Sequence, residues 1–382
     1  MRVLLSCFQS LRRHPIPAYD FWRDYFVKGL EEAGCEVVEI PGVDWAEGIV
    51  HRPGPRLDEW RTRTWETVAK FARQERAGKS IDLFLTYLYP QQVDESALAE
   101  LRRIGIRCVN FFCDNVREFR AIPASYRAFD LHWVPEFEAL GLYRRAGLRH
   151  IHAPMPCWIP QNLRGVPAVE TEPPSFIGSA DHLRRLLFGQ AIAAGADLIL
   201  WGNGWEGEPL GGNAPWRSPL RMLRNQAEIL VRQGAGALLT KLDNRLYWQD
   251  AAPIPQGRVR GAVSAEEYIR ITREAMVTVG VSRVSTPLQP DRRPLRYSRL
   301  RDIEAPMLGA CYLTEWTEGV ERLYELGAEI ETYRTPEEMA AKLAELSGDS
   351  QRRGAMRERA QRRALSDYSV PRTVKRISEM LF

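Results

Sequence analysis

The chain has 382 residues, of which 45% are apolar and 27% charged, a composition typical of a globular protein with a large core. This length exceeds one ordinary domain and predicts two domains of about 150 to 200 residues each. The net charge of +4 is small for such a chain, which argues against nucleic acid as a partner. Six scattered cysteines, without a CxxC pair or metal-like spacing, favour reduced thiols in a cytoplasmic protein.

The first half alternates short β-like runs with helical patterns. The opening RVLLSCF predicts a strand, because polar residues from Gln9 onward end the apolar run well short of a secretory or membrane segment. An amphipathic stretch follows at 21–34, and strand-like runs come at 81–88 and 107–114 with helical segments between them. Strands that alternate with helices imply a parallel sheet, since parallel strands need a crossover connection. We therefore predict a Rossmann-like N-terminal domain at 1–157.

Periodicity disappears between Pro154 and Pro174, where prolines are frequent, and this predicts a linker at 158–174. A second α/β series predicts a C-terminal domain at 175–360, followed by a helical tail at 361–382. Two such domains form a cleft at the carboxyl ends of their parallel strands, where α/β proteins bind ligands.

A helical insertion is predicted at about 206–260, because this stretch exceeds a minimal α/β unit. Its amphipathic part, 217–248, has a basic side that carries Arg217, Arg221, Arg224 and Arg232. Two interpretations stay open. The basic side can contact an anionic surface, which would place the protein at the inner face of the membrane, or the helices can pack on their own domain with the charges in solvent.

The segment FIGSADHLRR, residues 176–185, predicts a strand, a turn and a helix. Gly178 ends the strand, and Ser179 with the free N–H groups of the helix can bind a phosphate, because a helix N-terminus carries positive potential. Arg184 can close on the same anion. An ordinary strand–turn–helix unit has the same pattern, so a purely structural role stays open.

A second strand runs into a glycine turn in LILWGNGW, residues 198–205. Gly202 and Gly204 would let the backbone approach a ligand closely. Trp205 either stacks on a base or fills the core.

Arg301 and Glu304 are three residues apart in a predicted helix, so they project from one side of its first turn. The arginine can meet a phosphate, and the carboxylate can accept hydrogen bonds from two ribose hydroxyls. An ordinary intrahelical ion pair is the alternative.

Taken together, FIGS…R, WGNGW and RDIEAPMLGA…LTE…G…ELGAEIETY, followed by a charged helical tail, resemble the CgeB-like (spore maturation protein) glycosyltransferase family of GT-B fold. The resemblance covers nearly all of the C-terminal half, and FFCDNVREF in the N-terminal half is similar to the family's segment around an aspartate. It implies two Rossmann-like domains with a cleft between them, the donor nucleotide in the C-terminal domain, and a last helix that crosses back to the N-terminal acceptor domain.

The resemblance also implies the site residues. Arg301 and Glu304 match an Arg-x-x-Glu pattern, and Glu329 matches a Gly-x-Glu pattern. A lysine partner for the diphosphate is not found in this sequence, and Arg283, Arg296 or Arg299 can replace it. The expected donor-binding residues are Gly178, Ser179, Arg184, Gly202, Gly204, Trp205, Arg283, Arg301 and Glu304.

Catalysis is expected to need no metal and no cofactor, because fixed cations and helix dipoles can stabilise a leaving diphosphate. Deprotonation of the acceptor hydroxyl needs a base. The candidates are Asp114, which ends a predicted strand, and His14 and Asp20 in the loop after the first strand. For His14 a solvated loop position is the alternative. His132, His150 and His152 fit core or linker positions better.

These features predict a cytoplasmic glycosyltransferase that moves a sugar from a UDP-, GDP- or dTDP-sugar to a glycan, lipid-linked or protein acceptor in bacterial surface-glycan synthesis. A nucleotide-sugar-binding GT-B protein without turnover and a sugar-nucleotide epimerase of the same fold are the alternatives.

Overall fold

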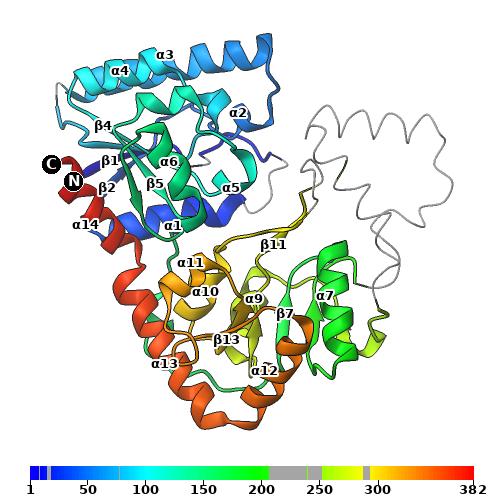
Figure 1. Cartoon of the computed structure of the whole chain (residues 1–382). Helices are drawn as coiled ribbons and strands as arrows, with labels where there is room; N and C mark the ends of the chain where they lie inside the picture. Colours follow the sequence, from blue (N-terminus) through cyan, green and yellow to red (C-terminus); the bar gives the residue numbers. More distant parts are fainter. Residues whose placement is uncertain (8, 15–18, 77, 206–238, 240–251, 287–292) are drawn as a thin grey trace. The chain divides into compact units, whose positions relative to one another are not determined.

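Two parallel six-stranded sheets organise the chain, each in a unit of its own. The computed structural model describes residues 1–7, 9–14, 19–76, 78–205, 239, 252–286 and 293–382 (Figure 1). One unit comprises Met1–Trp158 with Ser366–Phe382, and the other comprises Ile159–Leu365. The amphipathic stretch predicted at 217–248, apart from Leu239, and most of the predicted insertion at 206–260 lie outside the described residues.

The sheet of the first unit has the strand order β2-β1-β3-β4-β5-β6, with every neighbouring pair parallel. Its strands are β1 (Arg2–Leu5), β2 (Glu36–Val38), β3 (Leu83–Thr86), β4 (Arg107–Phe111), β5 (Leu131–Val134) and β6 (His150–His152). β3 is buried along its whole length, as expected for a strand covered by helices on both faces. The near-continuous apolar runs in the sequence therefore predicted these central strands correctly.

Helices and short 3₁₀ turns connect these strands. They are α1 (Tyr19–Glu32), α2 (Glu47–Val50), α3 (Pro55–Arg76), α4 (Glu95–Arg103), α5 (Asn115–Glu118), α6 (Leu140–Ala146), η1 (Pro90–Gln92), η2 (Ala124–Ala128) and η3 (Phe137–Ala139). Trp45, Trp65 and Phe84 pack together with ring centroids 5.5 to 6.0 Å apart. This aromatic core fixes the loop that follows β2 against α3 and β3.

The last helix, α14 (Val370–Leu381), belongs to the first unit, where it packs against α1. Val370 lies against Gly29, at which an added Cβ would come 2.5 Å from the valine Cβ. Arg149 donates a hydrogen bond to the Met380 carbonyl at 2.8 Å. The chain thus returns to its N-terminal unit in its last helix, as the sequence resemblance implied.

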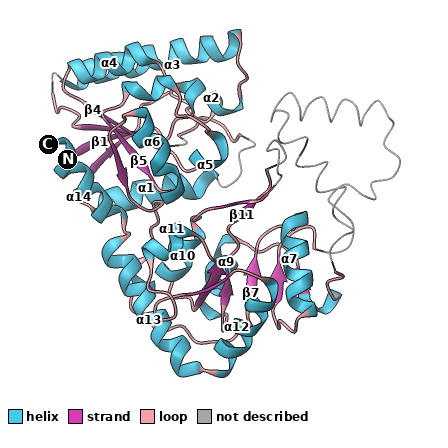
Figure 2. Ribbon diagram, viewed as in Figure 1, coloured by secondary structure: helices cyan, strands magenta, loops and turns pink. Residues whose placement is uncertain are grey.

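The sheet of the second unit has the order β14-β13-β10-β7-β8-β9, again parallel (Figure 2). Its strands are β7 (Ser175–Ile177), β8 (Ile199–Trp201), β9 (Val259–Arg260), β10 (Thr278–Val279), β13 (Tyr312–Glu315) and β14 (Glu331–Tyr333), and β11 (Arg283–Val284) pairs with β12 (Leu295–Arg296) as an antiparallel ribbon. The other elements are η4 (Gln161–Leu163), α7 (His182–Ala193), η6 (Gln256–Arg258), α9 (Ala265–Glu274), α10 (Arg301–Met307), α11 (Glu318–Leu323), α12 (Pro336–Gly348) and α13 (Ser350–Asp367). The carboxyl ends of its parallel strands lie at one edge of the sheet.

A buried arginine fastens α13 to the second unit. Arg357 is 7% exposed and donates hydrogen bonds to the carbonyls of Arg273 (2.7 Å), Ala275 (2.5 Å) and Gly309 (2.9 Å). Its charge faces Glu170, with a shortest N–O distance of 3.2 Å. With the Met276 carbonyl at 3.3 Å, four carbonyls from two segments of the chain depend on one guanidinium group.

Replacing this arginine by methionine should destabilise the second unit. Arg357→Met keeps the apolar stem but leaves buried carbonyls without donors, and we expect a loss of about 3 kcal/mol in the free energy of unfolding. Arg362→Met, on the exposed side of the same helix, should change it by less than about 0.5 kcal/mol. Chemical denaturation measures both. Equal effects of the two variants would contradict the anchoring role.

Candidate functional site

Two glycine-containing loops meet at the carboxyl ends of β7 and β8. The Gly178 amide donates to the Trp201 carbonyl at 2.7 Å, and the Ala180 amide donates to the Asn203 carbonyl at 2.9 Å. Asp181 caps α7, where its side chain accepts from the Arg184 amide. The two loops singled out in the sequence therefore lie side by side at the start of α7.

Gly202 is required by this close approach. It has φ +134°, and an added Cβ would lie 2.4 Å from the Gly178 carbonyl oxygen. Gly204 also has a positive φ, of 83°. The two glycines permit the contact between the loops, and this contact explains why glycine stands at both positions.

Trp205 fills the core of the second unit. Its side chain is 2% exposed, and its indole N–H donates to the Gly178 carbonyl at 2.8 Å. The ring packs edge-on against Phe176 and Phe188. The sequence left two roles open for Trp205, base stacking and core filling. The burial of the ring favours core filling.

Two arginines converge on one aromatic ring. The guanidinium carbon of Arg184 lies 5.6 Å from the centroid of Phe176, and that of Arg301 lies 5.4 Å from the same centroid. Arg301 also lies over the ring of Tyr268 at 5.7 Å. Gly178 makes room, since an added Cβ would be 2.9 Å from Phe176. The turn before α7 and the first turn of α10 thus meet.

Three guanidinium groups act on one another in this cluster, and the carboxylates of Asp181 and Glu304 compensate part of their charge. Burial lowers the pKa of Arg184, and the charges of Arg301 and Arg299 lower it further against the opposing effect of Asp181. Arg184 donates to the Ser179 carbonyl at 2.7 Å, while its Nε, 3.4 Å from the Asp181 carboxylate, has no hydrogen-bond partner among the described residues. A bound anion would relieve the repulsion among the three guanidinium groups.

The buried Asp302 fixes the first turn of α10. It is 1% exposed and accepts hydrogen bonds from Tyr312 Oη (2.8 Å), Thr314 Oγ1 (3.0 Å) and the Arg299 amide (2.7 Å). The neighbouring residues Arg301 and Ile303 are therefore held in place. Sequence reasoning missed Asp302, although a third charged residue within RDIE was the available signal.

Tyr268 contacts both Glu304 and Arg301. Glu304 is 8% exposed and accepts a hydrogen bond from the Tyr268 hydroxyl. Burial raises the pKa of that hydroxyl, and the Glu304 carboxylate raises it further. The Glu304 carboxylate and the Arg301 guanidinium group thus both contact Tyr268.

Arg283 has a structural partner instead. Its Nη2 lies 2.7 Å from Glu315, which is 1% exposed and also pairs with Arg296 at 2.7 Å. This pair fixes the β11–β12 ribbon to β13. Of the three arginines considered as substitutes for a lysine, Arg299 is the one whose charge acts on Arg184.

Glu329 also has a structural partner. It pairs with Arg363 of α13 at 3.1 Å and accepts from the Glu325 amide at 2.8 Å. The ion pair fastens the turn before β14 to α13.

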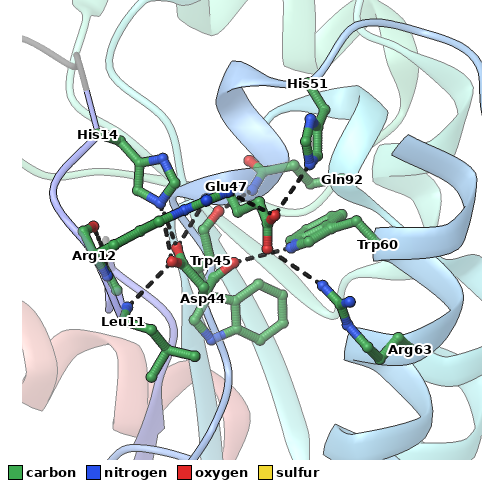
Figure 3. Close-up of polar contacts among 11 residues, drawn as sticks. Leu11, Arg12, His14, Asp44, Trp45, Glu47, His51, Trp60, Arg63 and Gln92 are labelled. Carbon is green, nitrogen blue, oxygen red and sulfur yellow. Dashed lines mark hydrogen bonds and ion pairs between the residues drawn. The ribbon is translucent and has the colours of Figure 1, made fainter. Parts of the chain in front are cut away.

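In the first unit, His14 is buried and paired with a carboxylate (Figure 3). Its Nε2 lies 2.9 and 3.1 Å from the two carboxylate oxygens of Asp44. Asp44 also accepts from the Leu11 amide at 3.1 Å and the Glu47 amide at 2.9 Å. An acceptor-only carboxylate places the proton on Nε2, which leaves Nδ1 of a neutral His14 as a proton acceptor.

Asp44 is a residue that sequence reasoning missed, and burial of His14 rules out the solvated loop position. The Trp60 indole donates to the Asp44 carbonyl at 2.9 Å, so the backbone of this residue is fixed as well. A carboxylate soon after β2, at the edge where parallel strands end, was the available signal.

Asp114 follows β4, at the same edge of the sheet as the loop after β1 that carries His14, with β3 between the two strands. It is half-buried at the start of α5 and makes no capping hydrogen bond. The structure therefore does not join Asp114 and His14 into one group of contacts.

Glu136 is a fully buried carboxyl near Asp114. It accepts from the Asn115 amide at 3.0 Å and from the Asn115 side chain at 2.6 Å, while Oε1 has no partner among the described residues. Burial raises its pKa from 4.5 to about 8. It is therefore protonated at neutral pH.

The other histidines of interest support the fold. Burial lowers the pKa of His132 to about 4, and it stacks on Tyr126. Burial also lowers the pKa of His152, and the charge of Arg376 lowers it further. His150 bonds to the Leu148 carbonyl at 2.8 Å.

With this geometry established, comparison with known proteins gives the family. The chain belongs to the glycosyl transferase-like family, whose model matches residues 184–379. A search of curated protein sequences gave no match.

Solved structures give the fold. A glycosyltransferase from Rickettsia africae has a TM-score of 0.55 at 11% identity, covering 100% of this chain and 97% of its own. The sucrose-phosphate synthase of Thermosynechococcus elongatus has a TM-score of 0.53 at 14% identity and 100% and 98% coverage. HepE of Anabaena, in complex with UDP, has a TM-score of 0.52 at 13% identity, covering 100% of this chain and 99% of its own. The fold is therefore GT-B, with two Rossmann-like units, as the sequence predicted.

The described residues also bear on membrane spans and metal sites. Within the described ranges, every helix is too short or too polar to cross a lipid bilayer. In the same part of the chain, three or more His, Cys, Asp or Glu side chains nowhere gather as metal ligands do.

Glu136 predicts a pH dependence of stability. A carboxyl whose pKa is higher in the folded chain keeps its proton on folding, so stability falls as pH rises from 4.5 toward about 8. Glu136→Gln removes the titrating proton and keeps an acceptor for Asn115, and we expect a higher Tm at about pH 8 than wild type but little difference at about pH 5. Thermal melts across this range, with exposed Glu66→Gln as control, measure it. Parallel curves for wild type and Glu136→Gln would contradict the raised pKa.

Proposed function

We propose that this protein transfers a sugar from a nucleotide-sugar donor to a hydroxyl group of an acceptor, and that the unit Ile159–Leu365 binds the nucleotide. The observation that carries the proposal is the convergence of Arg184 and Arg301 on Phe176, beside Glu304. Anionic and hydroxyl-rich ligands suit this arrangement, because it combines guanidinium groups with a carboxylate acceptor.

The residues of the cluster divide into two roles. Arg184, Arg299 and Arg301 bind the diphosphate, with the N-terminus of α7 adding positive potential near Ser179. Glu304 accepts hydrogen bonds from the ribose hydroxyls. The Tyr268 hydroxyl, which donates to Glu304 in this structure, either keeps its hydrogen bond beside the ribose or is replaced by it. Such exchange is favourable because a carboxylate has several acceptor positions.

A UDP-sugar is the donor to test first, followed by GDP- and dTDP-sugars. HepE of Anabaena was solved with UDP, and the T4 phage BGT, with a TM-score of 0.52 at 12% identity and coverage of 100% and 99%, was solved with UDP-glucose. Both support a uridine nucleotide in a chain of this fold.

In the reaction, the acceptor oxygen forms a bond to the anomeric carbon of the sugar while the bond from that carbon to the diphosphate oxygen breaks. The electron pair of the broken bond remains on the diphosphate, where three guanidinium groups stabilise the added charge. These fixed cations supply the stabilisation that a metal ion provides elsewhere, and we propose a metal-independent transfer on that ground.

His14 is the proposed base in this reaction. Asp44 holds Nε2, so Nδ1 can take the proton of the acceptor hydroxyl and the resulting imidazolium is stabilised by the same carboxylate. Asp114 is the second candidate, since it lies half-buried at the end of a strand. The pairing of His14 with a fixed carboxylate favours His14.

The finer biological assignment follows from the sequence resemblance. We propose a CgeB-like cytoplasmic enzyme that acts in the synthesis of a bacterial surface glycan, on a glycan, lipid-linked or protein acceptor. The predicted contact of 217–248 with the inner face of the membrane belongs to the same proposal.

Donor binding tests the cluster. Glu304→Ala and Arg184→Met should each raise the Kd for UDP about 10- to 100-fold, because each removes a hydrogen bond to or from a charged group. Calorimetry with the purified chain measures the Kd, and Glu321→Ala, an exposed glutamate on α11, is the matched control. Wild-type affinity in both site variants, for every nucleotide of the panel that wild type binds, would overturn the assigned site.

The base is tested by turnover. His14→Ala should lower kcat about 100-fold or more with an unchanged Kd for the donor, because the base acts on the acceptor proton and not on the nucleotide. Asp114→Asn is the comparison variant in the same transfer assay. A larger loss of kcat in Asp114→Asn than in His14→Ala would move the role to Asp114.

A further inference from the structure

A pocket of about 460 Å³ opens beside the His14–Asp44 pair, within the first unit. It lies between the loop after β1, the loop after β2 and helix α3. The lining residues are Leu11, Arg12, Gly42, Val43, Asp44, Glu47, Arg63, Thr64 and Thr67. Asp44 thus belongs both to the pocket wall and to the pair that holds His14.

The charged groups of the wall are balanced. Figure 3 shows Arg12 and Arg63 reaching Glu47 from opposite sides, with N–O distances of 3.0 and 3.3 Å. Asp44 already accepts from His14 and from two backbone amides. Two guanidinium groups and two carboxylates give a wall with no net charge, which offers no preference for an anion or a cation.

Two threonine hydroxyls belong to the wall. Thr64 lines the pocket, and no hydrogen bond joins its hydroxyl to another described residue. One turn further along α3, Thr67 donates to the Arg63 carbonyl at 2.8 Å and keeps its oxygen as an acceptor. A hydroxyl that lines a pocket can both donate to a ligand and accept from it.

We propose that this pocket binds the acceptor as an uncharged, polyhydroxylated group, that is, a neutral sugar unit. The inference rests on the proposed function, because Asp44 belongs both to the pocket wall and to the pair that holds the proposed base His14. Sugar hydroxyls both donate and accept, so they match a wall of threonine hydroxyls, carboxylates and guanidinium groups.

Other ligand classes fit less well. An acidic sugar or a phosphate would have to displace Glu47 from Arg12 and Arg63, and it would face the Asp44 carboxylate as well. An acyl chain would place apolar surface against these charged side chains and displace their water. The wall composition therefore selects a neutral hydroxylated group.

The test uses saturation-transfer NMR with methyl glucoside, methyl galactoside and methyl mannoside as neutral probes and the matching methyl uronides as acidic ones. Wild type should bind at least one neutral probe, more tightly than its uronide. Thr64→Val keeps the shape and removes the hydroxyl, so binding should weaken about five- to tenfold while the Tm stays equal or rises. Thr67→Trp fills the pocket and should abolish binding.

The matched controls are Thr62→Val and Thr62→Trp, which change an exposed threonine on α3 outside the pocket and should bind as wild type does. Tighter binding of a uronide, no binding of any neutral probe by wild type, or unchanged binding in Thr64→Val and Thr67→Trp would overturn the inference. UDP affinity measured on the same samples separates the two proposals. Normal UDP binding without glycoside binding would refute the acceptor pocket alone. Glycoside binding without any nucleotide binding would refute the donor site alone.

Discussion

The second unit depends on one buried carboxylate, Asp302. It joins the first turn of α10 to β13 through two side-chain hydroxyls and takes the Arg299 amide as a third donor. This turn in turn positions Arg301 over Phe176 and Glu304 at the Tyr268 hydroxyl. A buried carboxylate is stable in such a place because each of these donors compensates part of its desolvation. The proposed donor site therefore depends on Asp302, a residue with a structural role.

The first unit uses the same device at its own sheet edge. Asp44 accepts hydrogen bonds from two backbone amides and from the His14 imidazole, so a carboxylate organises two loops and fixes which ring nitrogen of His14 faces it. The two units differ in what surrounds the carboxylate. Around Asp302 the excess charge is positive and suits a diphosphate, whereas the wall near Asp44 is electrically balanced and suits hydroxyl groups. Under the proposed function, donor and acceptor chemistry therefore belong to different units.

Local patterns in the sequence predicted the parallel strands, the turn before α7 and the Arg301–Glu304 spacing, because each depends on residues close in the chain. Helix α3 was missed, although Leu57, Trp60 and Val68 recur at helical spacing and are buried. The His14–Asp44 pair joins loops 30 residues apart, and no periodicity encodes such a contact. Trp205 shows the remaining limit, since a glycine turn before a tryptophan is equally compatible with core packing and with ligand stacking.

The most direct test of the central claim is a crystal structure of the chain with UDP bound. The account predicts the diphosphate about 3 Å from the guanidinium groups of Arg184 and Arg301, with the ribose hydroxyls on Glu304. A nucleotide bound elsewhere, with Glu304 bonded to Tyr268 and solvent in place of the diphosphate, would contradict it.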